Sequence, residues 1–138
     1  REGIFIYIIP VCLLLFSSLL AFFIGLTTFL NYKFRSTNLI LSIAFFSIFW
    51  TFSEILRGHV FTGLPWNLLA HTLSNYNILI QICSVIGVYG LTFFIVYSVV
   101  SISVFVFEFK NKKHLFLLFS FVFIFYSIFL YGSNRLKN

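Results

Sequence analysis

The chain has 138 residues, of which 61% are hydrophobic and only 9% are charged, and its net charge is +6. Soluble globular domains carry roughly 45–50% apolar and about 25% charged residues, so the composition excludes a soluble enzyme, a secreted disulfide scaffold and a disordered chain. An excess of Lys and Arg in a soluble protein would indicate nucleic acid as a partner. In so apolar a chain it indicates membrane topology instead, and we expect a membrane protein with no nucleic-acid partner.

Charged residues divide the chain into four long uncharged segments, 3–32, 36–53, 58–107 and 114–134. About 20 apolar residues are enough to cross the hydrocarbon core as a helix, and a lipid-exposed backbone can satisfy its hydrogen bonds only in a helix or a closed barrel. The segments are continuously apolar rather than alternating, which argues against barrel strands. We therefore expect an all-α integral membrane protein, a bundle of four transmembrane helices at about 3–30, 39–56, 78–107 and 115–131, with no soluble domain.

The start of the chain is unusual, because it contains no methionine and begins with Arg1. We therefore expect a fragment of a longer protein. A secretory signal has an apolar core of about 7–15 residues, whereas the first apolar segment continues to about residue 30, so we interpret it as a true span.

The connection between the second and third spans contains two charged residues at its start, Glu54 and Arg57. They are i and i+3 on one helix face, close enough to pair. One interpretation is a snorkelling ion pair at a helix end. The other is a functional site, because ionisable groups within a membrane segment are costly and often functional.

Residues 60–69 break the helical pattern but stay apolar. Gly63 tolerates unusual backbone dihedrals and Pro65 cannot continue a hydrogen-bonded ladder. Irregular backbone at membrane depth occurs only where protein buries it or where it lines a cavity. We expect an irregular, partly re-entrant loop between helices two and three, bordering a cavity. Trp66 is either a residue of the interfacial aromatic belt or part of that site.

Other candidate sites are weaker. Cys83, Gly87 and Gly90 are spaced as in a helix surface that another helix approaches closely. His59 and His71 lack a third ligand at a recognisable spacing, and both cysteines lie inside apolar segments. We expect no metal, no cofactor and no catalytic residue.

Three sequence runs, 50–58 (WTFSEILRG), 61–66 (FTGLPW) and 87–93 (GVYGLTF), together resemble the membrane domain of bacterial apolipoprotein N-acyltransferases. The resemblance implies a multi-pass protein of the bacterial inner membrane that functions in lipoprotein maturation. The reaction transfers an acyl chain from a phospholipid to the N-terminal diacylglyceryl-cysteine of apolipoproteins. In the family, a periplasmic nitrilase-like domain carries a catalytic Glu-Lys-Cys set, which this chain lacks, so we expect no activity from the chain alone.

By this resemblance the chain supplies membrane anchoring and part of the lipid-substrate cavity, with substrate-binding residues Glu54, Arg57, Gly63, Pro65 and Trp66. Its partners are then a phospholipid, a diacylated apolipoprotein and the missing catalytic domain as a separate chain. The alternative is a non-catalytic small membrane scaffold or partner protein.

The distribution of basic residues predicts the topology. The two short loops carry Lys33, Arg35, Lys110, Lys112 and Lys113, whereas the longer connection offers only Arg57. Because cytoplasmic loops are enriched in Lys and Arg, we expect both short loops inside and both chain ends outside.

Reporter fusions should show cytoplasmic activity at Arg35 and Lys112 and periplasmic activity at His71. A cytoplasmic signal at His71 would contradict this topology.

Overall fold

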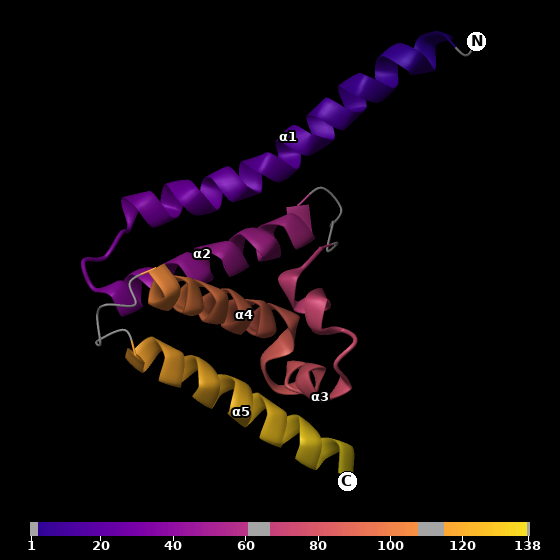
Figure 1. Cartoon of the computed structure of the whole chain (residues 1–138). Coiled ribbons are helices and arrows are strands. Elements are labelled where there is room, and N and C mark those ends of the chain that lie inside the picture. The colour runs from indigo at the N-terminus through magenta and orange to yellow at the C-terminus, as the bar shows by residue number, and fades with distance from the viewer. Residues whose placement is uncertain (1–2, 61–66, 108–114, 138) are drawn as a thin grey trace.

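A computed structural model of the chain describes residues 3–60, 67–107 and 115–137 (Figure 1). Its four long helices are α1 (Gly3–Lys33), α2 (Leu39–His59), α4 (Cys83–Phe107) and α5 (Leu115–Lys137). A short 3-10 helix, η2 (Leu69–Leu73), and a single helical turn, α3 (Asn77–Ile80), lie between α2 and α4. All four long helices are long and apolar enough to cross a membrane, and the described ranges contain no strand. The predicted four-helix membrane bundle is confirmed.

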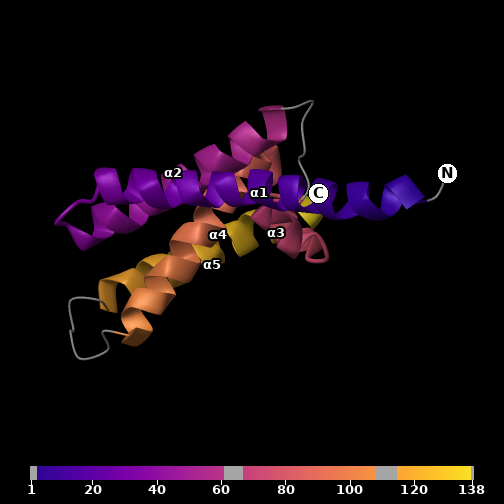
Figure 2. The same ribbon diagram turned by 90° about the horizontal axis from the view of Figure 1, so that it is seen from above.

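The long helices form a row in which each contacts its neighbour: α2 contacts α1 and α4, and α5 contacts α4 and α3. Figures 1 and 2 both place the turn between α1 and α2 at the same end as the last turn of α4 and the first turn of α5. The segment 67–82 and the C-terminus lie at the other end. In both views the first half of α1 extends beyond the other helices, and its buried residues, Phe23 and Thr27, lie in its second half.

Small polar side chains fill much of the buried space between the helices. Those with at most 5% of their surface exposed are Thr27, Ser47, Ser53, Thr92, Ser98 and Ser101. Small residues let the backbones of membrane helices approach closely, and their hydroxyls can bond within or between helices. The core of the bundle is therefore partly polar, while many of the large apolar side chains are exposed.

The third span is not the single continuous helix expected from residue 78. Gly87 has φ 69° and ψ 175°, which interrupts α4, and α3 is separated from α4 by a turn at residues 81 and 82. Glycine adopts positive φ without a steric cost, so the break falls on the residue that tolerates it. The interpretation of Gly87 and Gly90 as a close-packing surface is wrong. Nothing lies within 4 Å of where a Gly87 Cβ would be, and a Gly90 Cβ would meet Ile86 of the same segment.

The close approach that does occur involves Gly132 of α5, which our sequence analysis did not single out. A Cβ at this position would overlap the backbone carbonyl of Ile78 in α3. Gly132 therefore allows the backbone of α3 to lie directly against α5.

We expect Gly132→Ala to destabilise the chain by about 1–3 kcal/mol, because the added methyl group forces α3 away from α5. Gly25→Ala is the matched control, because nothing lies within 4 Å of its Cβ position in α1. Alanine favours a helix over glycine by about 1 kcal/mol, so this control should be neutral or stabilising. Unfolding of the two purified variants in detergent, followed by circular dichroism, compares them; equal stability would contradict the close contact.

Candidate functional site

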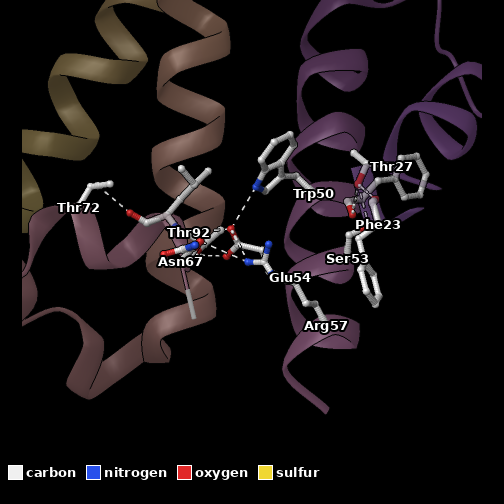
Figure 3. Close-up of polar contacts among 11 residues, drawn as sticks. Phe23, Thr27, Trp50, Ser53, Glu54, Arg57, Asn67, Thr72 and Thr92 are labelled. Carbon is white, nitrogen blue, oxygen red and sulfur yellow. Dashed lines mark hydrogen bonds and ion pairs between the residues drawn. The ribbon is translucent and has the colours of Figure 1, made fainter. Parts of the chain in front are cut away.

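The centre of the site is the carboxylate of Glu54, which is buried in the interface between α2 and α4 (Figure 3). Only 4% of the residue is exposed. Removing a carboxylate from water costs several kcal/mol unless charge and hydrogen bonds compensate it. The surroundings of Glu54 supply both.

Three donors from three parts of the chain bond to this carboxylate. Oε1 accepts from the indole Nε1 of Trp50 and from the backbone N–H of Leu69, each at 3.2 Å. Oε2 accepts from the hydroxyl of Thr92 at 2.9 Å. Trp50 is one helical turn before Glu54 on α2, Leu69 begins η2, and Thr92 lies on α4. The carboxylate therefore joins α2 to α4 and to η2 in the connection between them.

Arg57 adds the positive charge and a second link to the same connection. Its Nη2 lies 3.9 Å from Glu54 Oε1 and donates to the backbone carbonyl of Asn67 at 3.3 Å. Its side chain is 19% exposed. The predicted i, i+3 pair is present. Arg57 also bonds to the backbone of Asn67 rather than extending freely from the helix end.

Asn67 is the first residue described after α2 and Val60, and its φ of 60° lies in the left-handed region. Asparagine is one of the few residues other than glycine that tolerates this conformation. Leu68 and Ala70, which follow, are buried. Hydrogen bonds from Arg57 to Asn67 and from Leu69 to Glu54 thus hold the chain immediately after residue 66.

Gly58 completes the Glu-x-x-Arg-Gly sequence and has a steric role. A Cβ at Gly58 would lie 2.6 Å from the hydroxyl of Tyr89 on α4. The absence of a side chain thus leaves room for the Tyr89 hydroxyl against the end of α2.

The side of α2 that faces α1 carries a second polar contact. The hydroxyl of Thr27 lies 2.7 Å from that of Ser53 and 3.1 Å from the backbone carbonyl of Phe23. Figure 3 shows this contact on the side of α2 away from Trp50. α2 is therefore bonded through side chains to both of its neighbours.

Two pockets border these residues. One, of about 20 Å³, is lined by Phe23, Ile24, Thr27, Trp50, Ser53, Glu54 and Arg57. It has room for about one water molecule, and the buried Nε of Arg57 has no hydrogen-bond partner among the described residues.

The other pocket is apolar and larger, about 230 Å³, and lies between α2 and α4. Its lining is Phe46, Trp50, Leu69, Ile95, Val96, Val99 and Val100. Trp50 lines both pockets and therefore separates the small pocket beside Glu54 from the larger apolar one.

Of the five predicted substrate-binding residues, the structure brings Glu54 and Arg57 together. Gly63, Pro65 and Trp66 lie outside the described residues, as does most of the predicted re-entrant loop. Our sequence analysis missed Trp50 and Thr92 as donors to Glu54. The i, i+4 spacing of Trp50 and Glu54 could have indicated the first contact, whereas nothing in sequence spacing points to a residue 38 positions away. In the described ranges, no group of three or more His, Cys, Asp or Glu could hold a metal.

Comparison with known proteins identifies the family. The family model described as "Apolipoprotein N-acyltransferase N-terminal domain" matches residues 1–101. The apolipoprotein N-acyltransferase of Rickettsia bellii (strain RML369-C) is 36% identical over 101 residues, which cover 69% of this chain and 20% of the relative. Its counterpart from Rickettsia prowazekii (strain Madrid E) is 37% identical with the same coverage. The enzyme of Rhodopseudomonas palustris (strain ATCC BAA-98 / CGA009) is 52% identical over 42 residues, or 30% of this chain and 8% of the relative.

The chain thus spans about a fifth of the length of the Rickettsia relatives. No solved structure matches it. Four membrane-length apolar helices and relatives from bacteria make it a multi-pass bacterial membrane protein. Because the family model covers well over half of its residues, the chain belongs to the family of the apolipoprotein N-acyltransferase N-terminal domain.

Proposed function

We propose that this chain serves as part of the membrane portion of an apolipoprotein N-acyltransferase in the bacterial inner membrane. In this role it anchors the enzyme and forms part of the cavity for its lipid substrates. The reaction transfers an acyl chain from a phospholipid to the N-terminal diacylglyceryl-cysteine of an apolipoprotein. A nitrilase-like domain, joined to this chain or bound as a separate chain, performs the covalent chemistry.

The observation that carries this proposal is the bonding of Glu54 to α2, α4 and η2 at once. Both carboxylate oxygens of Glu54 accept from protein donors, so its proposed part is to position the chain around it. Asn67 and Leu69 directly follow Gly63, Pro65 and Trp66 in sequence. Glu54 and Arg57 therefore hold the chain directly after the three predicted residues in sequence.

The apolar pocket between α2 and α4 suits the substrate class. Ligand sites combine mostly apolar walls with a few well-placed polar groups. Here the walls come from residues such as Phe46 and Val99, and the polar boundary comes from Trp50 and Glu54. We assign this pocket to one acyl chain of the lipid substrate, with the Trp50 indole and the Glu54 carboxylate at its polar boundary.

The first test separates the shape of Glu54 from its charge. Glu54→Gln keeps a carbonyl oxygen for Trp50 and Leu69 and offers an amide to the Thr92 hydroxyl. We expect N-acylation by this variant, made in the complete native protein, to stay within about threefold of wild type. Glu54→Ala leaves buried donors unsatisfied at roughly 1–3 kcal/mol each and should lose activity at least about tenfold.

The measurement is incubation with phosphatidylethanolamine and a diacylated lipopeptide, followed by mass spectrometry for the gain of one acyl chain. Equal losses in Glu54→Gln and Glu54→Ala would contradict a positioning role, because they would show that the charge itself is needed. Full activity in both variants would remove Glu54 from the site.

A second test concerns Trp66. We expect Trp66→Ala to lower the acylation rate at least about tenfold, because truncating a large aromatic side chain at a binding site removes several kcal/mol of contact. Trp50→Phe is the matched control, since it keeps an aromatic ring beside the apolar pocket and removes one of the donors to Glu54. Its activity should remain within about fivefold of wild type, the cost of one hydrogen bond. If Trp66→Ala is no worse than this control, Trp66 belongs to the interfacial belt.

A further inference from the structure

A second polar cluster lies at the end of the bundle where α3, α4 and α5 meet, and the Glu54 site does not include it. Arg135 of α5 donates through Nη1 to the hydroxyl of Ser84 and to the backbone carbonyl of Gln81, the latter at 3.4 Å. The hydroxyl of Tyr131 lies 3.1 Å from that of Ser84. A guanidinium and two hydroxyls thus gather beside the last two turns of α5.

The charge of Arg135 is not balanced by an acidic residue in the described ranges. The one ion pair there is Glu54 with Arg57. A guanidinium offers five N–H donors, and both bonds identified for Arg135 use Nη1. The planar fork of Arg suits a phosphate group well. The cluster therefore has positive charge and donor capacity that protein groups do not fully use.

An apolar groove of about 330 Å³ starts at this cluster and runs between α4 and α5. It is lined by Ile82, Val85, Ile86, Phe94, Phe123, Ile124, Ser127, Ile128 and Tyr131. Its lining comes from both sides of the break at Gly87, since Ile86 precedes the break and Phe94 follows it. Tyr131 belongs to both features, because its ring lines the groove and its hydroxyl contacts Ser84.

The depth of the cluster in a bilayer follows from helix geometry. From Leu115, where α5 begins, to Arg135 the helix rises about 30 Å at 1.5 Å per residue, which is the thickness of a typical hydrocarbon core. The exposed Tyr76 lies in the connection just before α3, at the same end of the bundle. Tyrosine is enriched at the level of lipid headgroups. Arg135 therefore lies at headgroup level and the groove extends from it into the hydrocarbon.

We propose that this groove and cluster form a binding site for a glycerophospholipid. One acyl chain lies along the groove between α4 and α5. The phosphate lies against the guanidinium of Arg135 and the hydroxyls of Ser84 and Tyr131. This site is separate from the Glu54 network on the other side of α4, and it holds a lipid rather than consuming one. It does not depend on the proposed acyl transfer.

Native mass spectrometry of the purified full chain in detergent tests the site. Dioleoyl phosphatidylglycerol and dioleoylglycerol have the same acyl chains, but only the first has a phosphate. Hydrogen bonds to charged groups are each worth about 1.5–3 kcal/mol, so we expect the phospholipid to bind at least about tenfold more tightly. Equal affinity for the two lipids would overturn the proposal.

Two charge variants locate the phosphate. Arg135→Gln should reduce the preference for phosphatidylglycerol over dioleoylglycerol to about twofold or less. Binding of dioleoylglycerol should be unchanged, and this result would show that the groove is still folded in the variant. Lys137→Gln removes the same charge two residues away and should keep the wild-type preference, because no contact of Lys137 with the cluster is found. Equal effects of the two variants would indicate general attraction to basic residues and would overturn the site.

A third variant tests the groove. Ser127→Phe places a large ring in the groove and should weaken binding of both lipids at least about tenfold. Adding inorganic phosphate to about 10 mM should leave lipid binding unchanged, because a free anion gains no groove contacts. Displacement by inorganic phosphate would show a simple anion site. A dimer mass that disappears in Ser127→Phe would show that a second copy of the chain occupies the groove. Either result would overturn the proposal.

Discussion

A carboxylate within a membrane bundle must be surrounded by donors, and the arrangement of this chain around Glu54 follows from that requirement. Trp50 and Arg57 come from the same helix, Thr92 from α4 and the Leu69 amide from the connection. Replacing any of these partners by an apolar group would leave part of the charge uncompensated. The relative placement of α2, α4 and η2 is therefore tied to one side chain, and the segment that carries Trp66 ends at this point.

The rest of the bundle is held by close packing rather than by a large apolar core. Lipid chains are as apolar as leucine, so burying leucine between membrane helices gains little, and helices associate through small residues and polar bonds. The Thr27–Ser53 contact, the buried serines of α2 and α4, and the approach of α3 to Gly132 follow this rule. Most of the large phenylalanines face outward for the same reason, since exposure to lipid costs them nothing.

The features that could be predicted from the sequence are those that depend on local composition. Continuous apolar length gives the four helices, and an i, i+3 spacing gives the Glu54–Arg57 pair. The features that could not be predicted depend on contacts between distant segments, such as Thr92 with Glu54 or Ile78 with Gly132. Gly87 illustrates the difference. A glycine in an apolar segment can either allow a neighbouring helix to pack closely or adopt a positive φ that interrupts its own helix. Only the path of residues 77–86 in the folded chain decides between these two roles. The substrate-binding roles of Glu54, Arg57, Gly63, Pro65 and Trp66 stay predictions.

The order of residues along the chain has a consequence for biogenesis. During synthesis α2 enters the membrane before η2 and α4 can pack against it, so Glu54 then has Trp50 and Arg57 of its own helix as partners. An unpartnered acidic residue in an inserting helix is costly. Glu54 lies in the last two turns of α2, and Trp50 and Arg57, each about one turn from Glu54, reduce its cost from the start. The remaining donors arrive with η2 and α4. When α4 inserts, the Thr92 hydroxyl supplies the last of the hydrogen bonds to the Glu54 carboxylate, which entered the bilayer earlier with α2.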